Sequence, residues 1–461
     1  MTIWIPELAA RTGPKYLTVA EAIAEDISAG RLQPGTKLPP QRDLAWRLGV
    51  TVGTVSRAYT EAERQGLVRG EVGRGTYVLR PGLREGFPPR ETAPADHIDL
   101  SLSFPAPGEE AEHLSHALQR IAADPAAFDL LEYQTPAGNL RHRAAGAAWL
   151  SMTGIHAAAE QVVITSGAQN GILVAFAALT QPGDHILTES LTFPGVKPVA
   201  RMLGLRMEGL SVDENGLIPE ALETACRMQN SKFLYTIPTI HNPTAVVMPQ
   251  ERREAIAEIA RRHGLHIIED DIAARCMKDP PQPIATMVPE LTVYLTSLSK
   301  TVAPGLRIGF LHSPEELLER QASIVGASAW MAPPLTAELA TSWIEDGTAE
   351  RILDSRRAEA VARLALAREK LQGQCISATP GCHHIWLTLP EPWRAADFTA
   401  EAKRRGVIVA PAEIFAAGRV DVPHAVRICI GMPRYRNQLE SALDTLADIL
   451  KVNAFSDVSM V

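Results

Sequence analysis

From about residue 98 onward, short apolar runs alternate with stretches of helical periodicity, and this alternation limits the folds open to the chain. Gln250–His263 is one such helical stretch, and Gly264 follows it as a stop signal. Strands that alternate with helices predict an α/β fold, a mostly parallel sheet covered by helices. The apolar runs are Val162–Ile164, His185–Thr188, Phe233–Ile237, His266–Glu269 and Thr292–Thr296.

The loop after the last run combines a lysine with serines and an arginine. It reads Ser-Leu-Ser-Lys over residues 297–300 and Pro-Gly-Leu-Arg-Ile-Gly over residues 304–309. Lys300 can form a Schiff base with an aldehyde, and Ser297 and Arg307 can hold a phosphate beside it. An aldehyde and a phosphate on one cofactor indicate pyridoxal 5′-phosphate (PLP). A lysine taken alone is more often a solvated surface residue.

Other candidates for such a site follow the earlier strands. Gly167, Ala168 and Gln169 open a helix, whose backbone N–H groups can bind phosphate. Phe193 follows the second run, where an aromatic face can cover a flat ring. For each of these, an ordinary turn or ordinary packing is the competing interpretation.

Three polar residues complete the candidate set. The Asn242 amide can donate to a phenolic oxygen, or it can belong to a plain Asn-Pro turn. Asp270 can pair with a protonated ring nitrogen and strengthen the cofactor as an electron sink, or it can be a solvated acid. Arg427 lies in an apolar strand, where it needs either a ligand carboxylate or a structural ion pair.

In this order, the residues resemble the fold-type I PLP enzymes of the aspartate aminotransferase family over about residues 98–450. The resemblance implies that Lys300 is the Schiff-base lysine, that Asp270 pairs with the pyridine nitrogen and that Arg427 receives the ligand carboxylate. It further implies that Asn242 bonds the ring oxygen and that Phe193 stacks on the ring. The phosphate would be surrounded by Ser297, Arg307, Gly167, Ala168, Gln169 and, from the opposite subunit of a homodimer, Tyr133.

The chain departs from that family at two places. Relatives carry a tyrosine two or three residues after the aspartate, whereas this chain has Ile272 and Ala273, and Ala245 replaces a glycine that often follows Asn-Pro-Thr. The missing phenol removes one hydrogen bond, roughly 1 kcal/mol of binding. PLP binding should survive this loss, but proton transfer should be weakened, which favours sensing over turnover.

Residues 16–79 predict a compact helical unit that ends in a hairpin. A capping box at Thr18 predicts the start of the first helix. A second helix ends at Gly49, and a third can begin with Thr51 as its N-cap. Within the third, helical spacing predicts that a set of residues packs inward: Val52, Val55, Tyr59 and Ala62.

This unit resembles the winged helix-turn-helix domain of GntR-type bacterial regulators. The resemblance rests on the stretches 38–45, 50–59, 66–68 and 73–78, and it implies contacts to double-stranded DNA. The candidate DNA-contact residues are Arg42, Thr54, Arg57 and Arg74. From the spacing alone, a small helical dimerisation domain remains the alternative. Residues 1–80 contain 11 Lys and Arg against 8 Asp and Glu, while the whole chain carries −8, so charge favours nucleic-acid contact by this part only.

Residues 80–97 are rich in Pro and Gly, which predicts a linker. We expect the aminotransferase-like domain over residues 98–455, with a smaller α+β subdomain from about 315 to 455.

The sequence contains no apolar run long enough to suggest a membrane span. The five cysteines are scattered without a Cys-x-x-Cys pair, which indicates reduced thiols in a cytoplasmic protein. Cys382, His383 and His384 suggest a metal site, but no second ligand cluster accompanies them, so we expect no metal.

A GntR-type head joined to an aminotransferase-like body resembles the MocR-like regulators over nearly the whole chain. The resemblance implies a homodimeric transcriptional regulator that binds PLP as a Schiff base at Lys300 and senses PLP or an amino compound. One alternative is an active aminotransferase whose head is autoregulatory. Another is a DNA-binding protein whose body only mediates dimerisation. The sequence does not indicate the effector or the operator.

Overall fold

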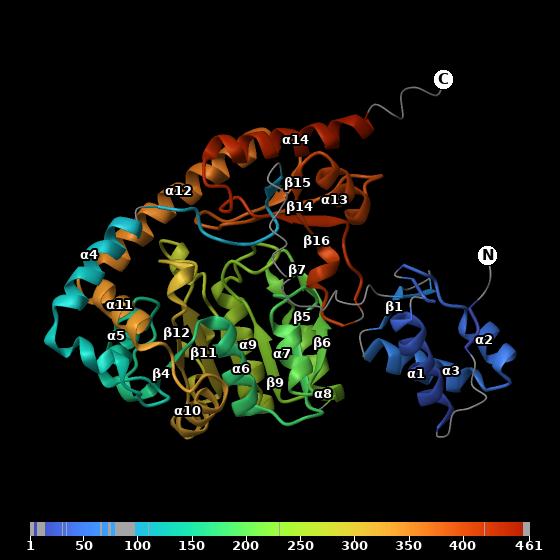
Figure 1. Ribbon diagram of the computed structural model, residues 1–461, viewed down its shortest axis with the longest axis horizontal. Coiled ribbons are helices and arrows are strands. Elements are labelled where there is room, and N and C mark those ends of the chain that lie inside the picture. The colour runs from blue at the N-terminus through green and yellow to red at the C-terminus, as the bar shows by residue number, and fades with distance from the viewer. Residues whose placement is uncertain are drawn as a thin grey trace. The chain divides into compact units, whose positions relative to one another are not determined.

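The structure is a computed structural model that describes residues 4–6, 14–29, 31–33, 35–64, 67–71, 75–78, 97–108, 110–229, 231–418 and 420–454 (Figure 1). The chain divides into two compact units, residues 1–91 and 92–461. The expected linker, apart from His97, lies outside the described residues, and so does Arg74.

The first unit combines helices with an antiparallel hairpin around a small apolar core. Val19 and Ile23 of the first helix pack with Val55 and Tyr59 of the third. The Tyr59 hydroxyl donates to the Pro39 carbonyl at 2.8 Å, which ties the third helix to the start of the second. The elements are α1 (Lys15–Ser28), α2 (Gln41–Leu48), α3 (Val52–Arg64), β1 (Val68–Glu71) and β2 (Gly75–Val78).

The predicted helix starts in this unit have different outcomes. The prediction for Thr51 is confirmed, because its Oγ1 accepts a hydrogen bond from the backbone N–H of Thr54 at 3.1 Å. The predicted start at Thr18 is wrong. Helix α1 begins after Pro14, and the Thr18 hydroxyl bonds back to the Pro14 carbonyl within the helix instead of capping it.

The inward face of α3 is confirmed for three of its four predicted residues. Val55, Tyr59 and Ala62 are buried. Val52 is 44% exposed, because it is the first residue of α3 and lies beyond the edge of the core.

The second unit is built on a seven-stranded sheet in the order β4-β12-β11-β10-β9-β5-β6. All five predicted runs are strands of this sheet. Neighbouring strands are parallel except around β12, which is antiparallel to both β11 and β4. The strands are β4 (Val162–Thr165), β5 (His185–Glu189), β6 (Arg206–Leu210), β9 (Phe233–Thr236), β10 (His266–Asp270), β11 (Thr292–Ser297) and β12 (Gly309–His312).

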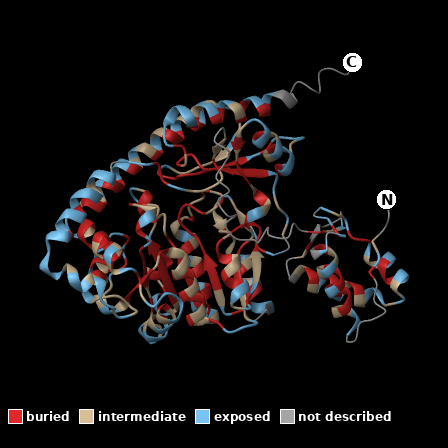
Figure 2. Cartoon of the chain, viewed as in Figure 1, coloured by how far each residue is buried: buried red, intermediate tan, exposed pale blue. Residues whose placement is uncertain are grey.

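Successive residues of these strands point to opposite faces, and helices cover both faces (Figures 1 and 2). Val163 packs with α6, α7 and α10, whereas Val162 packs with α5 and α11. Helix α9 ends at Gly264 as predicted, where φ is 58°. The helices here are α4 (Glu110–Ala123), α5 (Leu140–Ser151), α6 (Ala168–Leu179), α7 (Val196–Met202), α8 (Pro219–Gln229), α9 (Gln250–His263), α10 (Glu315–Ala329) and α11 (Pro334–Glu345), and a short hairpin is formed by β7 (Val212–Asp213) and β8 (Gly216–Leu217).

A smaller sheet follows in the order β13-β14-β17-β16, with its own core. Because α10 and α11 pack on the larger sheet, we propose that the smaller subdomain begins within α12, later than the expected residue 315. Its elements are α12 (Thr348–Lys370), β13 (Cys375–Ser377), β14 (Ile385–Thr388), α13 (Ala395–Arg404), β16 (Ala410–Pro411), β17 (Ala425–Ile428) and α14 (Arg436–Ala454).

The first described residues of this unit join the smaller subdomain. β3 (Ile98–Asp99) pairs in parallel with β15 (Val407–Ile408), and the Cys429 N–H donates to the Leu100 carbonyl at 2.8 Å. Among the described residues, the helices are too short or too polar to cross a membrane.

Candidate functional site

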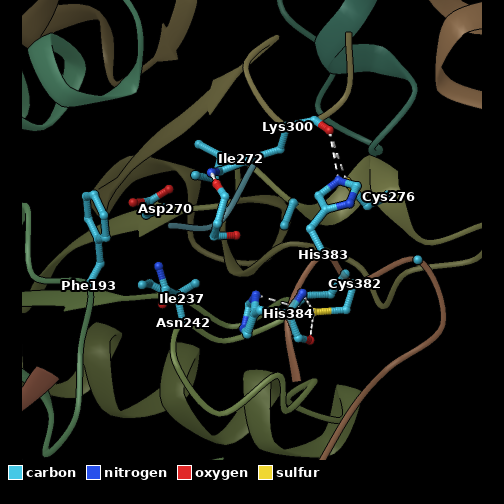
Figure 3. A pocket seen from close by; sticks show the side chains of 14 residues that line it. Phe193, Ile237, Asn242, Asp270, Ile272, Cys276, Lys300, Cys382, His383 and His384 are labelled. Atoms are coloured by element: carbon cyan, nitrogen blue, oxygen red, sulfur yellow. Dashed lines mark hydrogen bonds between the residues drawn. The ribbon is translucent and has the colours of Figure 1, made fainter. Parts of the chain in front are cut away.

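A pocket lies at the edge of the larger sheet where its parallel strands end (Figure 3). Four predicted residues line it: Phe193 follows β5, Asn242 follows β9, Asp270 ends β10 and Lys300 follows β11. Parallel strands present their carboxyl ends on one edge, so loops that are far apart in the sequence converge there. The structure therefore brings together the four residues expected around a flat ring.

Lys300 contributes a buried amine to this cavity. Burial lowers the pKa of Lys300 to about 8, because the charged form loses its hydration. Its Nζ donates to the Ser103 carbonyl, and the His383 Nε2–H donates to the Lys300 carbonyl at 3.0 Å (Figure 3). A pKa this low leaves an appreciable neutral fraction at neutral pH, which is the form that attacks a carbonyl carbon.

The two carboxylate oxygens of Asp270 have different surroundings. Oδ2 accepts a hydrogen bond from the Tyr235 phenol at 2.6 Å, whereas Oδ1 has no partner among the residues that the structure describes. Burial raises the pKa of Asp270 to about 6, although the Tyr235 hydrogen bond opposes that rise. An unpaired buried acceptor is costly, so Oδ1 fits a donor that a ligand brings.

Arg427 on β17 reaches the cavity through Asn242 and does not line it directly. Its Nη1 donates to Asn242 Oδ1 and its Nη2 to the Ser101 carbonyl, both at 2.6 Å. The guanidinium lies 4.7 Å from the centroid of the Phe415 ring, and its Nε has no partner in the described part of the chain. Since the Asn242 oxygen is occupied, the NH₂ group of its amide is the part that can donate to a ligand.

The predicted phosphate-binding residues gather where α6 begins. Gly167 is the N-cap of α6 with φ 80°, and a Cβ at this position would lie 2.5 Å from Arg307 Nη2. Ala168 is the first residue of α6, and Ser297 is the last residue of β11. Gly309 of β12 lies between the ends of β11 and β4, because it pairs with Ser297 on one side and with the last residue of β4 on the other. Helical N–H groups beside a guanidinium favour an anion.

Two side chains near this helix start have unmade hydrogen bonds. Gln169 Nε2 donates to the Gly195 carbonyl at 2.7 Å, but the Gln169 Oε1 is buried without a partner within the described residues. The Ser299 hydroxyl is also buried without a hydrogen-bond partner among the described residues, and the sequence did not point to Ser299. Buried polar atoms without partners are uncommon, so both are candidates for ligand contact.

Tyr133 lies on the surface and does not line the cavity of its own chain. Its side chain is 79% exposed, and its ring centroid lies 5.5 Å from that of Trp330. Phe128 and Leu131 are also exposed nearby in the sequence. An exposed cluster of large apolar side chains is typical of a protein interface.

A segment that we call the strap, residues 97–108, crosses the site directly after the linker. The Ser101 and Ser103 carbonyls accept the hydrogen bonds from Arg427 and Lys300 described above. The Ala106 carbonyl accepts a further bond from Arg356 Nη1 at 3.1 Å. Lys300 and Arg427 therefore both hold the backbone of the segment that leads to the head.

Three of the four predicted DNA-contact residues of the head lie on described elements, Arg42 on α2 and Thr54 and Arg57 on α3. Arg42 and Arg57 are exposed, and Thr54 and Arg57 line a concave surface at the start of α3. Lys15 and Tyr16 of α1 line the same surface and were not predicted. A groove that combines a helix start with basic side chains suits a phosphate backbone.

Known families match both parts of the chain. The family of class I and II aminotransferases matches residues 96–446, and the gntR family of bacterial regulatory proteins matches residues 15–78. The chain belongs to the aminotransferase class I and II family. Its N-terminal GntR domain gives it the two-domain arrangement of the MocR-like regulators, so the resemblances found in the sequence are confirmed.

Individual relatives agree with this assignment. The chain is 31% identical over 448 residues to the uncharacterized HTH-type transcriptional regulator YdeF of Bacillus subtilis, covering 97% of this chain and 96% of that protein. It is 28% identical to the vitamin B6 salvage pathway transcriptional repressor PtsJ of Salmonella typhimurium, covering 93% and 96%. The fold is similar to that of the Pyrococcus horikoshii kynurenine aminotransferase, with a TM-score of 0.72, 24% identity and coverage of 78% and 92%. These comparisons favour a transcriptional regulator over a stand-alone enzyme.

One of the two departures from the aminotransferase pattern lies at the cavity itself. Ile272 and Ala273 line it where relatives are expected to place a phenol. Ala245 adopts φ 58°, a left-handed conformation that a glycine would adopt without strain. The cavity lining at Ile272 and Ala273 is thus more apolar than the family pattern predicts.

Several functional candidates were missed by sequence reasoning. Tyr235 could have been found by the period of two along a strand, since it lies beside Ile268 on the face that also carries Asp270. His383 lines the cavity, and burial lowers its pKa to about 3, so it is a neutral donor. The described residues contain no cluster of three or more His, Cys, Asp or Glu side chains that could hold a metal ion.

Proposed function

We propose that this regulator binds PLP covalently through Lys300 and uses the bound cofactor, or an amino compound that reacts with it, as its signal. The observation that carries the proposal is the meeting of Lys300, Asp270, Asn242 and Phe193 around one cavity, in a chain with a GntR head. The heads of a homodimer would bind a DNA operator.

The residues present fit the groups of the cofactor. Asp270 Oδ1 would accept from a protonated ring nitrogen, and the Asn242 NH₂ would donate to the ring oxygen. The Phe193 side chain would cover the ring, and the start of α6 with Arg307 would hold the phosphate. PLP supplies an aldehyde that condenses with amines and an electron-withdrawing ring.

The effector proposed from Arg427 is an amino acid or another amine that carries an acidic group. Within the described residues, the Arg427 Nε has no hydrogen-bond partner and the Nη2 donates to the Ser101 carbonyl. A carboxylate accepts charge-assisted hydrogen bonds better than a neutral carbonyl does, so it would compete for Nη2.

We propose that the strap conveys this competition to the head. Attachment of a ligand at Lys300 removes the amine from Ser103, and a carboxylate at Arg427 releases Ser101. Since both carbonyls belong to the segment that follows the linker, the two states of the site hold the linker's end differently. A ligand shifts such an equilibrium only by its different affinity for the two states.

The proposed homodimer accounts for the exposed position of Tyr133. Leu131 and Tyr133 are 80% and 79% exposed, which a second copy would cover. In that arrangement, Tyr133 would reach the phosphate site of the opposite subunit.

The test is operator binding by the full-length protein, with and without PLP and candidate amines. Binding is measured by electrophoretic mobility shift or by fluorescence anisotropy. We expect wild type to respond and Lys300→Ala to bind DNA without responding. Lys278→Ala is a matched control, because Lys278 is an exposed lysine of the same unit, and it should respond as wild type does.

An unchanged response in Lys300→Ala would contradict the sensor and favour a body that only mediates dimerisation. An active aminotransferase is favoured by the lowered pKa of Lys300. It predicts conversion of bound PLP to its amine form with release of a keto acid in a single turnover, whereas the sensor predicts a stable adduct.

A further inference from the structure

Tyr235 contacts the cofactor-pairing candidate from outside the cavity. It lies on β9, and Asp270 ends the neighbouring parallel strand β10. The phenol donates to Asp270 Oδ2 at 2.6 Å, and both side chains are 1% exposed or less. Tyr235 does not line the cavity, so its effect on any ligand must pass through Asp270.

The Tyr235 ring has little freedom to move. It packs in the core beneath α6, and its centroid lies 5.9 Å from that of Phe176 in an edge-on arrangement of 75°. A fully buried ring in a packed core holds its hydroxyl in one place. The donor is therefore rigid, and the acceptor must adapt to it.

This rigid donor distinguishes the two oxygens of Asp270. The terminal torsion of an aspartate is broad and roughly two-fold, so an unheld carboxylate can rotate. With Oδ2 occupied, Oδ1 is the oxygen left without a partner in the described part of the structure. The phenol thus fixes which oxygen a ligand meets, and in which plane.

Some groups around Asp270 raise its pKa, whereas the phenol and, less strongly, the Ile272 backbone lower it. Burial, Asp271 and Glu189 all raise the pKa of Asp270, and the Tyr235 hydrogen bond is the strongest influence that lowers it. Lys300, in the loop after β11, is a cation that interacts with Asp270. The pKa of Tyr235 itself is held well above its usual range by burial and by Asp270, so the phenol remains a donor over the whole accessible pH range.

We propose that Tyr235 is a positioning residue for the proposed PLP site, which aims Asp270 Oδ1 into the cavity and keeps that carboxylate charged for a protonated ring nitrogen. The inference rests on the proposed function. It adds a residue that never touches the cofactor but sets the aspartate that does.

Tyr294 offers a matched control for this role. It is a second fully buried tyrosine, and its hydroxyl donates to Asp271 Oδ2 at 2.9 Å and lies 3.3 Å from Thr153 Oγ1. Tyr294→Phe therefore removes a similar hydrogen bond to the adjacent acid without touching Asp270. A merely structural role for Tyr235 predicts that the two variants behave alike.

The experiment measures PLP affinity of the full-length protein by visible absorption, across pH 5 to 9 as a rough working range. Hydrogen bonds to charged groups are the stronger class, so Tyr235→Phe should weaken PLP binding about tenfold, while Tyr294→Phe should remain within about twofold of wild type. Removing the donor raises the pKa of Asp270, so binding by Tyr235→Phe should be lost at a higher pH on acidification. Equal affinities and equal pH profiles in the two variants would overturn the role of Tyr235.

Two further readouts separate the possible failures. Wild-type protein that binds no PLP overturns the proposed function and this role with it. If Tyr235→Phe does not fold, 3-fluorotyrosine at position 235 keeps the ring and the donor but makes the phenol more acidic. It should move the acid limb of the PLP-binding profile to lower pH, and an unmoved limb would overturn the inference.

Discussion

Gly167→Ala tests the proposed phosphate site through two separable effects. Gly167 has φ 80° and ψ 172°, a conformation that side chains rarely adopt, so a Cβ costs about 1–3 kcal/mol of stability from the backbone alone. The same Cβ would lie 2.5 Å from Arg307 Nη2 and 2.7 Å from its Cζ. Because the end of an arginine can move, the guanidinium should be displaced from the start of α6 without unfolding the protein.

The size of the expected affinity loss follows from that displacement. Charge-assisted hydrogen bonds contribute about 1.5–3 kcal/mol each, so moving Arg307 should weaken PLP binding by roughly tenfold or more. Pyridoxal, which lacks the phosphate, should bind wild type and Gly167→Ala with similar affinity.

Gly183→Ala is the control for backbone strain. Gly183 has φ 100°, and a Cβ there would meet nothing within 4 Å. This variant should lose stability in thermal or urea unfolding, as Gly167→Ala does, while its affinity for PLP stays at the wild-type value. Equal loss of PLP and pyridoxal affinity in Gly167→Ala, or full retention of PLP affinity, would refute the assignment of the phosphate site.

Three other outcomes are expected. Asp270→Asn should stabilise the cofactor-free protein by about 2–3 kcal/mol above pH 6, measured by urea unfolding. The reason is that burial raises the pKa of Asp270 to about 6, so the wild-type folded state becomes less stable as pH rises from about 4 to 6. Equal pH dependence of stability in wild type and variant would contradict this. Arg427→Gln should weaken binding of a carboxylate-bearing amine at least tenfold while PLP affinity changes little, and an unchanged amine titration would remove Arg427 from the effector site. Arg57→Ala should weaken operator binding by about 1–3 kcal/mol, whereas Arg31→Ala, outside the groove and paired with Asp26, should not; equal effects in anisotropy titrations would contradict the placement of the groove.

The sequence predicted those parts of the fold that depend on local pattern. The apolar runs are strands, and Gly264 ends α9, because alternation and stop signals act within a few residues. The start of α1 was missed because Thr18 is equally able to bond back to a carbonyl inside a helix. The exposure of Val52 depends on where the core of the head ends, which local spacing does not determine.

At the site, residue types pointed to four of the residues that line the cavity, Phe193, Asn242, Asp270 and Lys300. The strap could not be predicted, because its contacts use the carbonyls of Ser101 and Ser103, and every residue has a carbonyl. Tyr235 was hidden for a related reason, since a tyrosine in an apolar strand suggests ordinary packing. Only the register of β9 beside β10 shows that its hydroxyl meets Asp270.

The covalent attachment of PLP is the claim on which the sensor depends, and chemical trapping measures it directly. Purified full-length protein loaded with PLP would be reduced with borohydride, digested and mapped by mass spectrometry. We expect a single phosphopyridoxyl group on the peptide that contains Lys300, and none in Lys300→Ala. A product without the group, or with the group on another lysine, would contradict the account.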